Sequence, residues 1–199
     1  MAGRKEYDLE TLKLKILEAT KEIIIKKGYK ELNIRDIAAA VGCSVGTLYN
    51  VFKNIYDIIL HINSETLDHL QTRVEKEQLR KKNKASFTKD IGKIYIQFAR
   101  DNLPIWSLLF EYQHPQDESL PRWYQAKVDH LFSSLESSLA HQFVGDKKKL
   151  KRISRSLWAG LHGICVLEVS GKLKTTKSES PEKLWDTLYK IYTKVLEAR

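Results

Sequence analysis

The sequence of 199 residues predicts an all-α fold. Apolar residues recur three and four positions apart through nearly the whole chain, which is the spacing of one face of a helix. The 4 prolines and 9 glycines fall mainly where such helical stretches begin or end. No stretch alternates apolar and polar residues strictly enough to indicate a β-strand.

Four helices are predicted in the N-terminal part of the chain. Asn33, Ser44 and Asn54 are residues that favour helix N-caps, because their side chains accept hydrogen bonds from free backbone N–H groups. Gly28 and Gly42 suit the left-handed conformation that often ends a helix. These signals predict a helix that ends at Gly28, short helices at 33–40 and 44–50, and a long helix at about 55–80.

A larger helical part follows the basic junction "RKKNKASFTK". Helical spacing predicts elements at about 86–102, 104–113, 121–144, 147–170 and 181–198, and "GKLKTTKSES" reads as a polar loop. We therefore expect an N-terminal domain at 1–54, a connecting helix and basic junction at 55–84, and a larger helical domain at 85–199.

Composition narrows the class of protein. A hydrophobic content of 42% and a charged content of 30% are ordinary for a globular protein. No apolar run is long enough to span a membrane, and the N-terminus lacks the pattern of a signal peptide. Cys43 and Cys165 lie far apart and are expected to be reduced thiols in a cytoplasmic protein. No spacing indicates a metal site, a cofactor or a catalytic pair, so we expect no enzyme.

The stretch "NIRDIAAAVGCSVGTLYNVFKN" at 33–54 has the pattern of a helix-turn-helix. Ile37, Ala38, Val41 and Phe52, with Leu48 or Val45, would form its small core. The other side chains of the second short helix would then face the major groove of DNA. Any helical hairpin gives a similar pattern, so the spacing alone leaves both readings open.

The amino-acid sequence of this motif resembles that of the tetracycline-repressor (TetR) family of transcription regulators. The similarity covers residues 9–60, with "ILEATKEIIIKKGYKE" before "LNIRDIAAAVGCSVGTLYNVF" and "DIIL" after it. Further on, "LWAGLHGICVLEVSGKL" resembles a Trp-x-x-x-His-Gly signature in one class of C-terminal domains of this family. The resemblance implies a homodimer that binds double-stranded operator DNA and an unknown small-molecule effector, most often as a repressor that the effector releases.

The resemblance also implies roles for eight residues in DNA binding. Arg35 would contact a base or a phosphate, and Lys53 would reach a phosphate. On the second short helix, Thr47 and Tyr49 match positions that hold phosphates, while Val45 falls where bases are read. Asn50 also falls where bases are read, and Ser44 and Gly46 complete the recognition positions.

Residues 31–60 contain few basic side chains for a DNA-binding segment. Arg35 and Lys53 stand against Glu31, Asp36 and Asp57, whereas the whole chain carries a net charge of +9. Ile55 also replaces a lysine that is common in the family, and Val51 replaces a ring with a donor. An alternative is therefore a helical ligand-binding or interaction protein whose DNA-reading domain has weakened. Arg4 and Lys5 could add a basic arm.

The helical domain offers candidate residues for an effector site and for a dimer interface. Aromatic residues that could line a cavity are Tyr95, Phe98, Trp106, Phe110 and Trp123. The resemblance implies a dimer interface of four helices, two from each protomer, built by the stretch around 147–170 and the final helix. The interface candidates are Trp158, His162, Cys165, Val169, Trp185, Leu188 and Tyr192.

Overall fold

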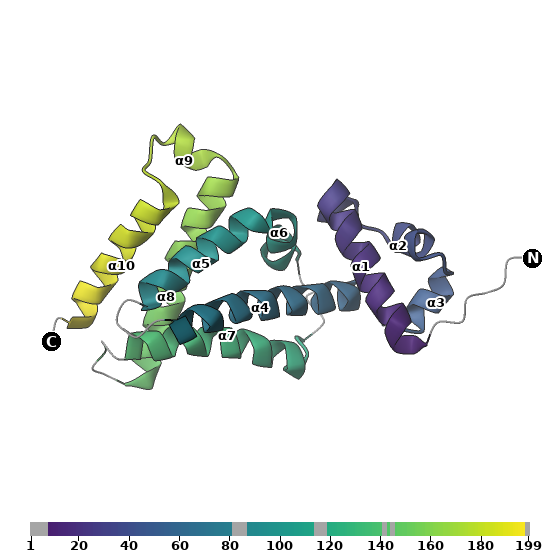
Figure 1. The fold of residues 1–199 in the computed structure, drawn as a ribbon, viewed down its shortest axis with the longest axis horizontal. Coiled ribbons are helices and arrows are strands. Elements are labelled where there is room, and N and C mark those ends of the chain that lie inside the picture. The colour runs from purple at the N-terminus through teal and green to yellow at the C-terminus, as the bar shows by residue number, and fades with distance from the viewer. Residues whose placement is uncertain (1–7, 81–86, 114–118, 141–142, 144–145, 198–199) are drawn as a thin grey trace, which may run out of the picture. The chain divides into compact units, whose positions relative to one another are not determined.

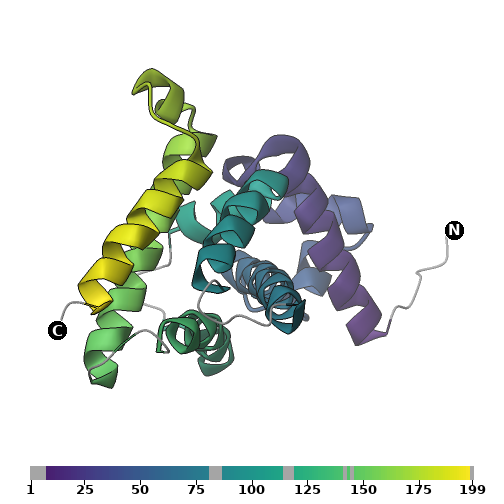
Figure 2. The same cartoon turned by 60° about the vertical axis from the view of Figure 1, so that its left-hand side comes forward.

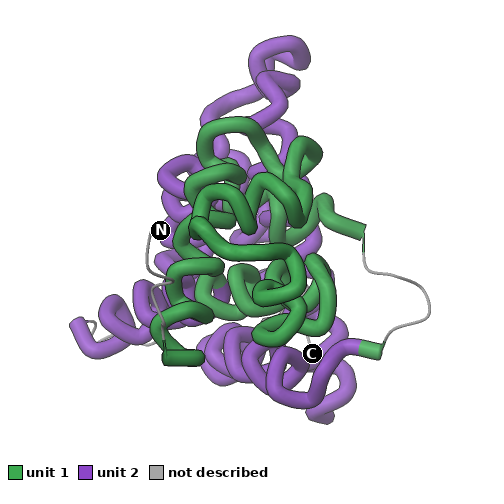
Figure 3. The backbone as a smooth tube through the Cα atoms, turned by 90° about the vertical axis from the view of Figure 1, so that its right-hand side faces the viewer, with its two compact units in different colours: residues 1–66, 104–119 green, residues 67–103, 120–199 purple. Residues whose placement is uncertain are grey.

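A computed structural model describes residues 8–80, 87–113, 119–140, 143 and 146–197, with side chains up to residue 194. Helices account for all the regular secondary structure of these residues, which confirms the predicted all-α fold. The chain forms two compact units (Figures 1 and 3). The first unit comprises residues 1–66 and 104–119, and the second comprises residues 67–103 and 120–199.

The first unit contains the helix-turn-helix. Its elements are α1 (Leu9–Lys27), the 3-10 helix η1 (Tyr29–Glu31), α2 (Ile34–Val41), α3 (Val45–Tyr49), the first part of α4 (Ile55–Arg80) and most of α6 (Leu103–Glu111). The predicted caps are confirmed: the Asn33 side chain accepts a hydrogen bond from the N–H of Asp36, and that of Ser44 accepts one from Thr47. Asn54 caps α4 in the same way, through the N–H of Asp57.

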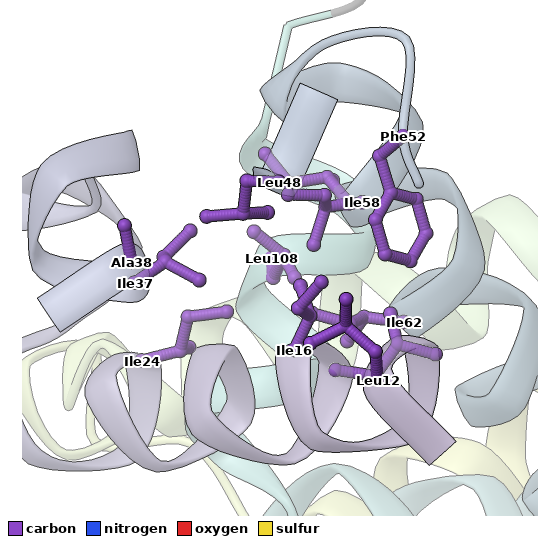
Figure 4. Close-up of a cluster of buried hydrophobic side chains, with 12 residues drawn as sticks. Leu12, Ile16, Ile24, Ile37, Ala38, Leu48, Phe52, Ile58, Ile62 and Leu108 are labelled. Carbon is purple, nitrogen blue, oxygen red and sulfur yellow. The ribbon is translucent and has the colours of Figure 1, made fainter. Parts of the chain in front are cut away.

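The core of the first unit includes a residue from a distant part of the chain. Ile16 of α1, Ile37 of α2 and Leu48 of α3 are fully buried together. Leu108 of α6 is equally buried within the same cluster, as Figure 4 shows. The segment 104–119 therefore belongs to the unit of the helix-turn-helix, whereas the sequence placed it in the C-terminal domain.

The second unit is built from five longer helices and one short one. They are the later part of α4, α5 (Phe87–Asp101), α7 (Arg122–Ala140), α8 (Lys147–Val169), α9 (Lys172–Thr175) and α10 (Pro181–Glu197). α10 packs against α8 and α5, and it lies beside α8 in Figures 1 and 2. The helix α9 falls within the stretch that the sequence predicted to be a loop, so that prediction is wrong for residues 172–175.

Salt bridges join the helices of the second unit. Arg100 of α5 contacts Glu168 of α8 and Glu182 of α10, both at 2.5 Å. These two carboxylates raise the pKa of the Arg100 guanidinium, so this group keeps its positive charge at any physiological pH. A second pair joins Lys89 of α5 to Asp186 of α10 at 2.9 Å. The Arg100–Glu182 and Lys89–Asp186 pairs hold the N-terminal half of α10 against α5.

Candidate DNA-binding surface and internal cavity

The turn between α2 and α3 depends on Gly42. Its φ of 76° and ψ of 33° are left-handed, and its N–H donates to the carbonyl of Ala38. The N–H of Cys43 donates to the same carbonyl at 3.0 Å, so the end of α2 is closed by two bonds. This geometry sets the path of the chain into α3. The thiol of Cys43 packs against the core, and burial raises its pKa.

The predicted DNA-contacting residues divide by exposure. Those with exposed side chains or backbone are Arg35, Ser44, Gly46, Tyr49, Asn50 and Lys53. Tyr49 exposes half of its surface although it is a large aromatic residue, and a protein core would normally bury such a ring. The remaining two, Val45 and Thr47, are half-buried. The exposed set gives α2 and α3 a polar outer surface.

Ser44 and Thr47 form a local hydrogen-bond pair. The Thr47 N–H donates to Ser44 Oγ at 3.0 Å, and the two hydroxyl oxygens lie 2.8 Å apart. The pair orders the first turn of α3. Two neutral hydroxyls are thus held at the N-terminal end of α3, ahead of Tyr49 and Asn50.

Three apolar residues of the motif have a structural role. Val45, Val51 and Ile55 are partly buried and pack against the hydrophobic core of the first unit. They therefore stabilise the helix-turn-helix. The sequence analysis named Val45 as a possible core residue, but it considered Val51 and Ile55 only as lost DNA contacts, although their apolar character was the signal for packing.

The acidic side chains near the motif are tied to local structure. Asp36 lies 3.4 Å from Lys27, and Asp57 accepts a hydrogen bond from the N–H of Lys53 at 3.0 Å. Both carboxylates stand in the first turn of a helix, where the helix dipole favours negative charge. Part of their charge is thus compensated by the protein, which reduces the repulsion that they would exert on DNA.

The second unit encloses an apolar cavity of about 50 Å³. α4, α5, α7, α8 and α10 all contribute to its wall. The lining residues are Leu70, Val74, Ile91, Tyr95, Leu131, Phe132, Ser134, Leu135, Leu157, Trp158, Leu161 and Trp185. The volume is about a third of an engineered cavity of about 150 Å³ that binds benzene.

Three polar groups in this wall have protein partners. The Tyr95 hydroxyl lies 2.9 Å from Nδ1 of His162, and Ser134 Oγ accepts a hydrogen bond from Gln71 at 3.1 Å. The indole N–H of Trp185 donates to the carbonyl of Lys89 at 2.8 Å. The cavity therefore presents an almost entirely hydrocarbon surface to whatever fills it.

Of the five aromatic residues predicted to line an effector site, Tyr95 lines this cavity. Phe98 is buried on the same helix, where the Arg73 guanidinium lies over its ring. Trp106 and Phe110 lie on α6 in the first unit, and Trp123 is 41% exposed on α7. Aromatic content alone could not distinguish these positions, because it does not tell which side of each helix turns inward.

The predicted dimer-interface residues turn largely into their own protomer. Cys165 and Trp185 are almost fully buried, and burial raises the pKa of the Cys165 thiol to about 12. Trp158 lines the cavity and stacks on His162 with ring centroids 5.4 Å apart. Val169, Leu188 and Tyr192 are half-buried. Because Cys165 and Trp185 are buried within a single chain, they do not offer the surface contacts for a partner that the sequence predicted.

A different face of the same two helices is exposed and apolar. Val166 and Leu167 of α8 are 41% and 43% exposed, and Ile191 of α10 is 55% exposed. Gly163 lies one turn before Leu167, and a Cβ there would meet open space. Sequence reasoning missed this face because it assigned the conspicuous Trp and His side chains to the interface.

Two kinds of feature are absent from the described residues. In this part of the chain, no group of three or more His, Cys, Asp or Glu side chains is arranged to hold a metal ion. None of the helices described is long and apolar enough to cross a membrane.

A helix-turn-helix with an exposed polar outer surface, joined to a helical unit with an internal cavity, defines a DNA-binding protein of two-unit architecture. The model of the tetR family of bacterial regulatory proteins matches residues 16–62, and the tetracyclin repressor-like C-terminal domain model matches residues 88–191. The chain belongs to the TetR family of transcription regulators.

Similar proteins include regulators of fatty acid metabolism. The fatty acid metabolism regulator protein of Bacillus subtilis is 31% identical over 64 residues, which span 32% of this chain and 33% of that protein. The structure of the Thermus thermophilus repressor FadR with lauroyl-CoA has a TM-score of 0.69 at 15% identity, covering 94% of this chain and 96% of that one. Bacillus subtilis FadR with stearoyl-CoA has a TM-score of 0.65 at 14% identity, with 90% and 97% covered.

Proposed function

We propose that the protein is a homodimeric repressor that binds operator DNA and leaves it when an acyl-CoA thioester occupies the second unit. Its DNA contacts are the eight residues Arg35, Ser44, Val45, Gly46, Thr47, Tyr49, Asn50 and Lys53. The observation that carries this proposal is the pairing of an exposed polar outer surface on α2 and α3 with a hydrocarbon-lined cavity in the other unit.

The DNA contacts follow from the chemistry of the exposed side chains. Arg35 and Asn50 can each form two hydrogen bonds to a base edge. Tyr49, Lys53 and the Ser44–Thr47 pair supply donors for phosphate oxygens, which fix the position of the motif on the duplex. Val45 remains partly in the core and offers a methyl group for a thymine contact. Gly46 carries no side chain, so the DNA backbone can approach α3 closely.

The class of effector follows from the cavity wall. The hydroxyls of Tyr95 and Ser134 and the indole N–H of Trp185 have protein partners, and the wall is almost entirely apolar. An occupant therefore gains most from buried hydrocarbon. An acyl chain has this chemistry, and two proteins of similar fold bind acyl-CoA molecules. A cavity of about 50 Å³ is too small for such a chain. Binding must therefore select or create a more open form, which supplies the conformational difference that an effector needs.

The dimer would use the exposed apolar face of α8 and α10. Val166, Leu167 and Ile191 form apolar positions that a single chain leaves open to solvent. Gly163 adds no bulk on this side, so a second helix can approach α8 closely. Two copies of each helix would then give an interface of four helices.

The first test measures binding of the purified full chain to DNA from upstream of its own gene by fluorescence anisotropy. Shuffled DNA of equal length is the control, and palmitoyl-CoA is then added with free CoA as its control. We expect specific binding that palmitoyl-CoA abolishes and free CoA does not. Specific binding that no acyl-CoA affects would refute the effector class and leave the DNA-binding function standing.

A second test addresses the weakened DNA-reading domain. Ile55→Lys restores the family's lysine at a position where isoleucine packs on the core. We expect less than a tenfold gain in operator affinity, because Arg35, Tyr49 and Lys53 already supply contacts. If no genomic DNA is selected by the native chain, and Ile55→Lys confers strong binding, the protein is a ligand-binding relative that has lost its operator.

A further inference from the structure

The wall of the cavity is unequally shared among its helices. Among the side chains that the structure describes, α4, α5, α7 and α8 each contribute two or more residues, whereas α10 contributes Trp185 alone. The indole of Trp185 is about 1% exposed, so it is enclosed although it comes from a helix packed on the outside of α5 and α8. The Trp185 side chain therefore reaches past α5 and α8, the helices that α10 covers, and lines the cavity.

Gly92 of α5 makes room for this indole. A Cβ atom built on Gly92 would lie 2.0 to 2.4 Å from three atoms of the Trp185 ring, far inside van der Waals contact. The ring thus lies directly on the backbone of α5, and any other residue at position 92 would displace it. The absence of a side chain at this point is a steric requirement of the Trp185 position.

Two polar contacts hold Trp185 in this position. Its indole N–H donates to the carbonyl of Lys89 at 2.8 Å, one turn before Gly92 on α5. The next residue, Asp186, forms a salt bridge with the Lys89 ammonium at 2.9 Å. The same residue of α5 therefore binds both Trp185 and its neighbour, which fixes the ring at one side of the cavity.

We propose that Trp185 is the residue that limits the length of the acyl chain accepted by the cavity. This inference rests on the proposed function, in which the effector is an acyl-CoA. A chain that enters among the residues of α4, α7 and α8 ends against the indole, whose far side lies on the backbone of Gly92. The ring cannot retreat toward α5, so each methylene beyond this point must remain in solvent or displace Trp185.

The test is isothermal titration calorimetry of the full chain with saturated acyl-CoAs from hexanoyl to stearoyl, in steps of two carbons. Each newly buried methylene should raise affinity about fourfold. For the native protein we expect this rise to stop at one chain length. In Trp185→Leu the rise should continue for at least one further step of two carbons, with about a sixteenfold gain at that step. Trp185→Phe should give a smaller extension.

Trp123→Phe is the matched control, because Trp123 is 41% exposed on α7 and lies outside the cavity wall. It should keep the native limit. Circular dichroism and cooperative thermal unfolding establish that each variant is folded. An unchanged limit in the folded Trp185 variants would overturn the inference, even if acyl-CoA still releases the operator. If the native chain binds no acyl-CoA of any length, the proposed effector class fails first, and the chain-length limit fails with it.

Fluorescence quenching in the native protein, with folded Trp185→Phe as the reference, gives a second readout. Acyl-CoA brominated at the chain terminus should quench the share of tryptophan fluorescence that Trp185→Phe lacks. Bromine at mid-chain should quench this share less. Equal or stronger quenching by the mid-chain label would contradict contact between the chain end and Trp185.

Discussion

At the scale of single residues, two glycines of the helix-turn-helix have opposite roles. Gly42 has a φ of 76°, where a side chain is strained, whereas Gly46 lies inside α3, where a Cβ would make only an ordinary contact of 3.7 Å with Ser44 Oγ. Gly42 is thus required by the fold. Gly46 is a position where the fold would accept a side chain.

The same substitution should therefore change stability in opposite directions. Gly42→Ala should lower the free energy of unfolding by about 1–2 kcal/mol because of left-handed strain. Gly46→Ala should raise it by about 0.5–1 kcal/mol through its helix propensity, yet weaken operator binding by adding a methyl group at the DNA surface. Urea denaturation and anisotropy measure the two effects. If Gly46→Ala left operator affinity unchanged, the DNA backbone would not approach α3 at this position.

His162 predicts a pH dependence of stability. Burial lowers its pKa below the ordinary value, so the folded protein disfavours the charged imidazole. As pH falls through about 6.5, the unfolded chain takes up the proton first, and stability is lost. His162→Gln should lose less stability between about pH 7.5 and about pH 5.5 than the native chain, as measured by thermal unfolding.

His69→Gln is the control for this comparison, because His69 is exposed on α4. It should keep the native difference between the two pH values. Equal pH dependence in the native chain and in His162→Gln would show that the burial of His162 does not penalise protonation.

Residue identity predicted some of these features and not others. The caps at Asn33 and Ser44 follow from local hydrogen-bonding chemistry, so the sequence was sufficient to find them. The position of Trp185 depends on Gly92, which lies 93 residues earlier in the chain. Local patterns carry no information on such pairs, and this is why the sequence assigned Trp185 to the molecular surface.

At the scale of elements, α6 departs most from the sequence-based expectation. Its helical spacing was predicted, but its unit was not, because the pattern shows only that one face is apolar. Leu108 lies in the core with residues of α1, α2 and α3. Tyr112 stacks on Tyr56, with ring centroids 6.3 Å apart, and the Tyr29 hydroxyl donates to Glu111 at 3.1 Å. The helix-turn-helix unit is therefore completed by a segment that begins 38 residues after the end of its first part.

Truncation of this contact should destabilise the DNA-binding unit. Leu108→Ala should cost about 2–5 kcal/mol, the range for large-to-small changes in a core. Leu79→Ala makes the same change at a position 88% exposed on α4 and should stay within about 0.5 kcal/mol of the native value. Hydrogen exchange resolved by residue measures both, and protection in α1 to α3 should fall for Leu108→Ala alone. Equal loss in the two variants would refute the core role of α6.

For α8 and α10, the sequence predicted the helices correctly but did not show which face of each helix is buried. Both helices were predicted, but the bulky residues Trp158 and Trp185 turn inward, while Leu167 and Ile191 are exposed. A large aromatic side chain gains more by burial than a leucine, since it removes more apolar area from water. The smaller apolar residues are left for the outer surface.

This exposed face predicts the oligomeric state. Leu167→Glu should convert a dimer to a monomer at micromolar concentration, because a buried carboxylate without a partner is costly. Leu79→Glu, at an exposed position on α4, should leave the dimer intact. Sedimentation velocity distinguishes the two species. A dimer that survived Leu167→Glu would have to use another surface.

At the scale of the whole molecule, the net charge of +9 is not concentrated at the DNA-reading motif. Many basic residues lie on the second unit instead, including exposed Lys147, Lys148 and Lys149 at the start of α8. The proposed DNA contacts are neutral donors beside Arg35 and Lys53. Sequence-specific binding should therefore show a shallow dependence on salt.

The salt dependence can be dissected with single lysines. Each phosphate neutralised contributes a slope of about −0.9 in log affinity against log salt. A dimer uses Lys53 twice, so Lys53→Ala should make the slope less steep by about 1.8. Lys174→Ala removes an exposed lysine of α9 and should leave the slope unchanged. If both variants changed the slope equally, DNA would attract the protein through its general charge and not through Lys53.

The membership of segment 104–119 in the first unit has a consequence for building hybrid regulators. A junction near residue 54 or 66 would leave Leu108 and Tyr112 with the donor of the ligand domain, facing a foreign set of core residues. A functional hybrid should instead exchange two pieces together, residues 1–66 and 104–119, as one inherited module. The unit that would read DNA is thus encoded by two separate stretches of the gene, and recombination at a single point would rarely transfer both together.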